Sequence, residues 1–143
     1  MNGFPPPAAL TSLTPIEAAA LPPAVLAYLG DAVYELLIRE ALLARGPASP
    51  HVLHRQATAL VCAPAQARMA RALAGEFTAE EAAVFRRGRN AHCGVAPAAA
   101  TAVEYRLATG LESLMGFLYL AGRRERLADL LAKGLRSLEE GRD

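Results

Sequence analysis

Two acidic residues, Asp31 and Glu112, each lie in a strongly apolar helical pattern and close to a glycine. Asp31 follows Gly30, and Glu112 precedes Gly116 by four residues. Glycine in a helix interior costs roughly 0.5–1 kcal/mol relative to alanine, and an unpaired buried charge costs several kcal/mol. Glycines would let two helices approach closely, and a divalent cation between the acids would offset their burial. The pattern therefore predicts a metal site at a helix crossing.

The surroundings of the two acids leave an alternative open for Asp31. Asp31, Glu35 and Arg39 share one helix stripe, so an exposed face stabilised by a Glu35–Arg39 ion pair also explains it. Two roles follow for Glu35: it contacts a metal ion through a water molecule, or it forms only the surface ion pair with Arg39. Glu112 has no such explanation, because its helix is apolar almost all round and the acid needs a partner.

A concentrated basic run without an intervening acid is the second candidate site. It consists of Arg86, Arg87, Arg89, Asn90 and His92. Arginines at the end of a helix favour its negative dipole, so a solvated helix end is one interpretation. The planar guanidinium group also matches phosphate geometry, and the run leads into a glycine-bearing segment. Phosphate contact is therefore the other interpretation.

Composition and length predict the scaffold that positions these residues. The chain has 143 residues, 53% of them hydrophobic and 20% charged, with frequent alanine, which favours a single all-α domain. We expect residues 1–13, which are rich in proline, to be disordered and residues 14–143 to form the domain. The net charge of +1 indicates no globally basic nucleic-acid binder. Any RNA contact must come from a local patch or from paired protomers.

Capping residues and apolar periodicity place the helices. Thr78 with Glu81 is a capping box, and Thr14 and Ser49 are further N-cap residues. The segment from Gly88 to Ala100 is expected to be a loop. The expected helices span residues 14–20, 24–44, 50–60, 64–74, 79–87, 101–121 and 125–138.

The chain shows no sign of secretion or membrane insertion. Cys62 and Cys93 are too few for a disulfide framework, and residues 1–13 lack the basic start and apolar core of a signal peptide. The most apolar stretch, residues 111–122, is too short to span a bilayer. We therefore expect a soluble, cytoplasmic protein with no membrane partner.

The same residues resemble a known family. The helix around Gly30 and Asp31 resembles the signature helix of the ribonuclease III family, and the stretch around Glu112 resembles its second acidic motif. The resemblance is closer to the compact bacterial branch, Mini-ribonuclease III, which lacks a separate double-stranded-RNA-binding domain. Further blocks of that branch match, in the same order, at residues 53–67, 86–92 and 105–120. Together the blocks cover most of residues 21–131.

The resemblance implies a ribonuclease III-like helical endonuclease domain that works as a homodimer on double-stranded RNA. The positions matching Asp31 and Glu112 bind Mg²⁺ in that family and are needed for phosphodiester hydrolysis. Larger members of the family carry further acids where this chain has Ala27 and Thr109. The resemblance therefore does not decide whether a second metal ion binds. In the compact branch the substrate is precursor large-subunit (23S) ribosomal RNA.

Two other functions are compatible with parts of the sequence. The missing acids at Ala27 and Thr109 would suit a catalytically silent ribonuclease III-like module that only binds structured RNA. The near-neutral charge would suit a helical protein-interaction domain. Mg²⁺-dependent strand scission separates the first alternative from a nuclease, and salt-sensitive RNA binding argues against the second.

Overall fold

The structure, a computed structural model, describes residues 3–6, 13–91, 96 and 100–141. Within these residues the chain forms helices and no strands, which confirms the predicted all-α fold. Most of the predicted proline-rich segment and His92 lie outside the described residues. The helices are α1 (Pro15–Ala19), α2 (Pro23–Ala44), α3 (Pro50–Val61), α4 (Ala63–Leu73), the short 3-10 helix η1 (Ala74–Glu76), α5 (Ala79–Asn90), α6 (Ala102–Leu120) and α7 (Arg124–Glu140).

Local side-chain chemistry sets where several of these helices begin. Thr14, Thr78 and Thr101 each form a capping box, in which the threonine hydroxyl accepts a hydrogen bond from the backbone N–H three residues later. The glutamate at that third position accepts a hydrogen bond from the threonine N–H in return. Ser49 caps α3 with its side chain. These starts agree with the predicted boundaries to within a residue or two.

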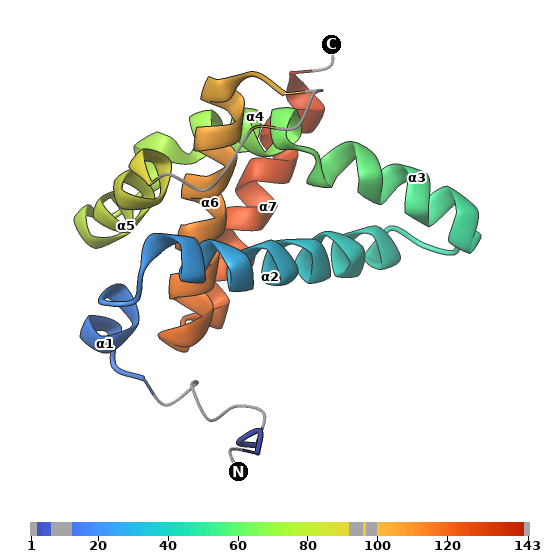
Figure 1. Ribbon diagram of the computed structural model, residues 1–143. Helices are drawn as coiled ribbons and strands as arrows, with labels where there is room; N and C mark the ends of the chain where they lie inside the picture. The colour runs from blue at the N-terminus through green and yellow to red at the C-terminus, as the bar shows by residue number, and fades with distance from the viewer. Residues whose placement is uncertain (1–2, 7–12, 92–95, 97–99, 142–143) are drawn as a thin grey trace.

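Helix α6 is the centre of the fold (Figure 1). It packs against α1, α2, α4, α5 and α7, so almost every side chain from Ala108 to Leu120 is buried. A helix that is apolar all round can be stable only in such a position. The burial that the all-round apolar pattern predicted for this helix is therefore confirmed.

Helix α5 is longer than its sequence predicted. The expected loop from Gly88 to Ala100 is wrong for residues 88–90, which continue α5 to Asn90. Gly88 is buried, and a side chain there would overlap the hydroxyl of Ser113 on α6. Because the glycine brings the two helices together, tertiary packing outweighs the low helix propensity that suggested a loop.

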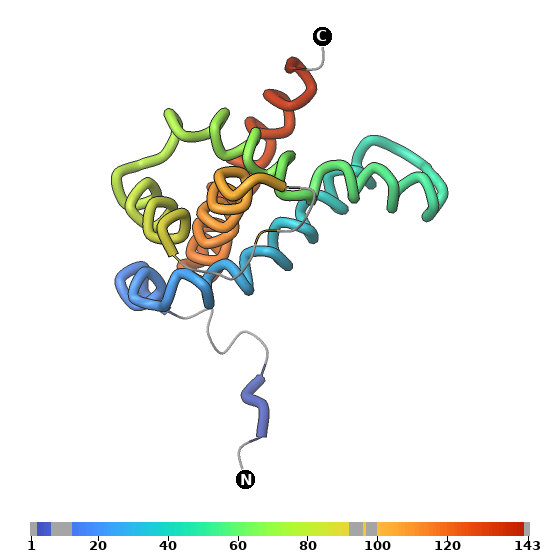
Figure 2. The backbone as a smooth tube through the Cα atoms, turned by 45° about the horizontal axis from the view of Figure 1, so that its top comes forward, coloured from blue at the N-terminus to red at the C-terminus, as the bar shows by residue number. Residues whose placement is uncertain are grey.

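The C-terminal part of α2 and helix α3 form an antiparallel hairpin that extends beyond the helices around α6 (Figure 2). The hydroxyl of Tyr34 on α2 donates a hydrogen bond of 2.7 Å to the carbonyl oxygen of Leu60, near the end of α3. Tyr34 is completely buried, and burial raises the pKa of its hydroxyl. This bond fixes the point at which the chain turns from α3 into α4.

None of the described helices is long and apolar enough to cross a membrane.

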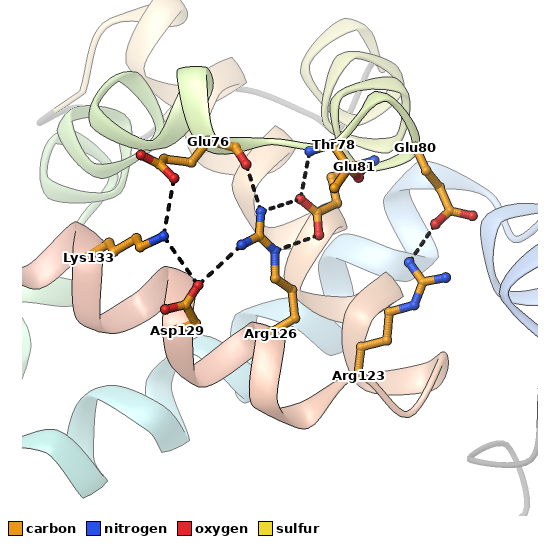
Figure 3. Close-up of polar contacts among 8 residues, drawn as sticks. All are labelled: Glu76, Thr78, Glu80, Glu81, Arg123, Arg126, Asp129 and Lys133. Atoms are coloured by element: carbon orange, nitrogen blue, oxygen red, sulfur yellow. Dashed lines mark hydrogen bonds and ion pairs between the residues drawn. The ribbon is translucent and has the colours of Figure 1, made fainter.

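A buried ion pair joins α5 to α7 (Figure 3). The Glu81 carboxylate is 2% exposed and accepts hydrogen bonds of 2.9 Å from Nε and Nη2 of Arg126. The same Nη2 also donates to the carbonyl of Glu76 at 2.7 Å. Burial alone would raise the pKa of Glu81, but the bonds from Arg126 and from the N–H of Thr78 outweigh it and lower the pKa.

We expect Arg126→Met to lower the free energy of unfolding by about 3–5 kcal/mol, because it leaves the Glu81 charge buried without its partner. Since the Glu81 pKa is lowered in the folded state, this contribution is present above pH 4.5 and is lost as the pH falls further. Urea unfolding of the native protein and of Arg126→Met at several pH values measures this difference in the free energy of unfolding. Lys133→Met, which removes exposed pairs with Glu76 and Asp129, is the control and should cost under about 1 kcal/mol. Equal losses in both variants would contradict the prediction.

Candidate active site

The two glycines identified beside the acids lie where α2 crosses α6. A side chain at Gly30 would overlap the backbone carbonyl of Glu112, and one at Gly116 would overlap the backbone carbonyl of Leu26. The backbones of the two helices are therefore in direct contact at this crossing. This confirms the close approach that the glycines predicted.

The crossing brings Asp31 and Glu112 together. Asp31 is exposed on α2 and Glu112 is partly buried on α6, and both line one open cleft of about 700 Å³. The two carboxyl groups are within hydrogen-bonding reach of each other. Tyr105 and Thr109 on α6 also line the cleft.

Burial and like charge dominate the electrostatics of the pair. Desolvation, followed by the hydrogen bond and the charge of Asp31, raises the pKa of Glu112 to about 8. Two carboxylates so close cannot both be ionised easily near neutral pH unless a positive charge lies between them. The arrangement is thus an uncompensated acidic pair at the surface of a cleft.

Three further cleft positions bear on the number of metal ions. Ala27 and Thr109, the positions at which the family resemblance raised the question of a second metal ion, both line the cleft and are buried. The Thr109 hydroxyl donates to the carbonyl of Tyr105 at 3.0 Å, a bond within its own helix. Glu35 lines the cleft too, but its carboxylate lies 2.8 Å from the guanidinium of Arg39. The surface ion pair that was one of two interpretations of Glu35 is therefore present.

The donor set of the cleft fits one Mg²⁺ ion. Among the described residues no group of three or more histidine, cysteine, aspartate or glutamate side chains converges. Mg²⁺ does not need such a cage, because it takes one or two protein carboxylates and completes its shell with water and phosphate oxygens. Asp31 and Glu112 are the residues that would supply those carboxylates, and the cation would relieve their mutual repulsion.

The structure separates the members of the basic run. Arg86, Arg87 and Asn90 line a shallow groove beside Pro23, at the start of α2. Arg87 donates hydrogen bonds to the carbonyls of Ala19 and Leu21, so it also ties α5 to the turn before α2. Arg86 forms no hydrogen bond or ion pair with the described residues and is exposed.

The other two members of the basic run, Arg89 and His92, are not part of the groove lining as the structure describes it. Arg89 is partly exposed outside the groove lining and donates to the side chain of Asn90 at 3.3 Å. His92 is outside the described residues, so the phosphate contact expected for it as a member of the run stays a prediction.

One polar residue next to the site was missed by sequence reasoning. Gln66, on α4, is 2% exposed, lines one hollow together with Glu112 and favours the charged form of its carboxyl group. Its only signal in the sequence is an amide among the otherwise apolar residues 63–67, and that signal does not indicate its partner.

Comparison with known proteins identifies the family. The model of the Ribonuclease III domain matches residues 24–123. The chain is 48% identical over 121 residues to a Mini-ribonuclease 3 of Symbiobacterium thermophilum, covering 85% of this chain and 93% of that protein. It is 50% identical over 108 residues to a Mini-ribonuclease 3 of Enterococcus faecalis, covering 74% and 82% of the two chains.

A solved structure agrees with these sequence relatives. An X-ray crystal structure of a protein from Fusobacterium nucleatum matches 87% of this chain and 98% of its own chain, with a TM-score of 0.76 and 26% identity. The shared fold, the acidic pair at the crossing of α2 and α6 and the matched relatives all agree. The chain therefore belongs to the ribonuclease III family, in its Mini-ribonuclease 3 branch, and is an endoribonuclease.

Proposed function

We propose that this endoribonuclease cleaves double-stranded RNA with one Mg²⁺ ion held by Asp31 and Glu112, and that its substrate is precursor 23S ribosomal RNA. Family membership supports the substrate class, since ribonuclease III enzymes act on double-stranded RNA. The observation that carries the metal is the acidic pair in the cleft, with the pKa of Glu112 raised to about 8. Such a pair is strained without a cation and suited to binding one.

The chain's own residues position the reaction. Asp31 and Glu112 present carboxylate oxygens from two helices whose backbones touch, so their separation is held by the crossing at Gly30 and Gly116. When bound there, Mg²⁺ supplies Lewis-acid activation of water and neutralises charge at the scissile phosphate. Because the cleft is open and Asp31 is exposed, a duplex can approach without entering the protein interior. Recognition of A-form RNA through its shape, phosphates and 2′-hydroxyls requires no base-reading pocket.

We also propose that the enzyme is a homodimer, joined through α2. Four large apolar side chains are exposed along one face of this helix: Val25, Tyr28, Leu36 and Leu43. Their spacing places them on one stripe of an α-helix, adjacent to Asp31. Such a stripe is typical of a surface covered by a second copy, and enzymes of this family generally act as dimers. Sedimentation of the purified chain measures the oligomeric state.

The test of the proposed function is incubation of the purified protein with long double-stranded RNA and with a precursor 23S transcript, with Mg²⁺ or with a chelator. We expect scission of both RNAs with Mg²⁺ only, and discrete ends on the precursor. Cleavage that persists with the chelator would contradict the metal assignment. RNA binding without scission would favour a silent module, and random cleavage of the precursor would contradict the substrate.

We expect Arg86→Gln to weaken RNA binding without lowering the melting temperature, because Arg86 is exposed and has no partner among the described residues. If it contacts one phosphate, the slope of log K against log salt should fall by somewhat less than one. Arg87→Gln should lower the melting temperature as well, since it removes the bonds to Ala19 and Leu21. Binding is measured without divalent cation at several salt concentrations.

The matched control is Arg136→Gln, which removes the same charge from an exposed position on α7. Its salt slope should equal that of the unmodified protein. Adding Arg89→Gln to Arg86→Gln tests whether the run acts as a unit. An unchanged slope in the double variant would make the run a solvated helix end only.

A further inference from the structure

Gln66 is a buried amide in the first two turns of α4, surrounded along the helix by small and apolar residues. It is 2% exposed, and Ala65, Ala67 and Met69 beside it are fully buried. A buried amide is costly unless its donors and acceptor find hydrogen-bond partners. Among the described residues no buried side-chain nitrogen or oxygen lacks such a partner. The identity of that partner therefore indicates why an amide stands here.

The partner of Gln66 is the Glu112 carboxylate. Helix α4 packs against α6, and Gln66 and Glu112 line the same hollow of about 340 Å³. From this shared hollow the Gln66 amide acts on the Glu112 carboxyl group and favours its charged form. Apart from Cys62 and Tyr105, the hollow is walled by alanine, valine and proline, so few other polar groups can orient Glu112 from this side.

Glu112 is thus contacted by Asp31 from α2 and by Gln66 from α4. A glutamate side chain has several rotatable bonds, and a metal site needs one orientation of the carboxylate. Hydrogen bonds to the outer side of a metal ligand fix that orientation, and their loss typically lowers metal affinity or activity by about 10- to 100-fold.

We propose that Gln66 is a positioning residue for Glu112: its amide group donates to one carboxylate oxygen and holds the other toward Asp31. The role rests on the proposed function, because it assumes that Asp31 and Glu112 bind a divalent cation together. Gln66 itself touches neither the RNA nor the cation. Its effect is transmitted through the orientation of Glu112.

The test is Gln66→Met, which keeps an unbranched side chain of similar size and removes the donor. We expect the dissociation constant for Mg²⁺, measured by titration calorimetry without RNA, to rise about 10-fold or more. The Mg²⁺ concentration at half-maximal cleavage should rise equally and kcat at fixed Mg²⁺ should fall. The KM for double-stranded RNA should stay within about twofold, because the RNA surface is unchanged. The sedimentation coefficient should equal that of the unmodified protein.

The control is Met69→Leu, a substitution on the same helix at a buried position that packs toward Gly134 on α7. It should leave Mg²⁺ affinity and kcat unchanged even if it lowers the melting temperature. Wild-type Mg²⁺ affinity and kcat in Gln66→Met would overturn the positioning role. If Gln66→Met does not fold, Gln66→Asn, whose amide is one methylene too short, must show the same loss or the role is overturned.

The outcome of this test is distinct from a failure of the proposed function. If the unmodified protein binds no Mg²⁺ and cleaves RNA in a chelator, the metal assignment itself is wrong. If the unmodified protein depends on Mg²⁺ and Gln66→Met behaves identically, only the role of Gln66 is wrong.

Discussion

Asp31→Asn and Glu112→Gln should each abolish RNA cleavage while leaving the fold and the oligomeric state intact. Each amide keeps the shape of the side chain but loses the charge that would hold Mg²⁺. Metal-ion catalysis supplies several kcal/mol of transition-state stabilisation, so the expected loss is roughly 10³-fold or more. Single-turnover cleavage of double-stranded RNA, with circular dichroism and sedimentation, measures both parts of the prediction.

Glu35→Gln is the matched control for this pair. Glu35 lines the same cleft, but its carboxylate is paired with Arg39 at 2.8 Å, so its loss should change the cleavage rate by less than about tenfold. Full activity in Asp31→Asn would refute the metal assignment. A loss in Glu35→Gln as large as in Asp31→Asn would mean that Glu35 is also a metal ligand.

The Glu112→Gln variant has a second, independent readout in the absence of divalent cations. In the unfolded chain Glu112 releases its proton near pH 4.5, whereas in the folded protein it keeps the proton up to about pH 8. The folded state therefore binds more protons between these values, and the native protein loses stability as the pH rises through them. Glutamine does not titrate, so the stability of the variant relative to the native protein should increase over the same range. Thermal melting in chelator at several pH values measures this, and a stability difference that does not change between pH 4.5 and 8 would contradict the raised pKa of Glu112.

Gly30→Ala and Gly116→Ala should destabilise the protein strongly, although alanine is the better helix former. At an exposed helical position the change would gain nearly 1 kcal/mol. Here the added methyl group would overlap backbone carbonyls of the opposite helix, and backbone atoms cannot rotate away as a side chain can. Overpacking costs roughly 1–3 kcal/mol or more, and leucine at either position should cost more than alanine.

Cleavage should be lost along with stability in the two glycine variants. The contacts lie next to Asp31 and Glu112, so any separation of α2 and α6 moves the carboxylates apart, and a shift of about 1 Å can cost about 100-fold in rate. Gly75→Ala is the control, because nothing lies within 4 Å of a side chain added there. Thermal melting, sedimentation and cleavage assays decide the result. A stable, active enzyme in both Gly30→Ala and Gly116→Ala would mean that the helices do not need this contact.

Much of the fold could be predicted from the sequence because the relevant signals are local. The threonine and the glutamate of a capping box are three residues apart, and both belong to the helix end that they stabilise. The all-round apolar pattern of α6 requires burial whatever its neighbours are, so its burial could be inferred without knowing them. The glycines beside two acids likewise indicated a helix crossing before the partner helices were known.

Predictions failed or stayed open where the answer depends on residues distant in the chain. Gly88 looked like the start of a loop, but it continues α5 because Ser113 on α6 packs against it. Arg87 looked equivalent to Arg86, but only Arg87 meets the carbonyls of Ala19 and Leu21. Gln66 stood out as an amide among the apolar residues 63–67, but this local signal did not indicate its partner.

The sequence by itself determined the helical fold class, most of the helix starts, the family and the two acids beside their glycines. Only the tertiary structure decided that Gln66 meets Glu112, that Arg126 pairs with the buried Glu81 and that Arg87 is bonded to the turn before α2. The physical reason is the range of the interactions. Caps and apolar periodicity act within one or two helical turns, whereas a polar contact between helices depends on how each helix is rotated and displaced against the other.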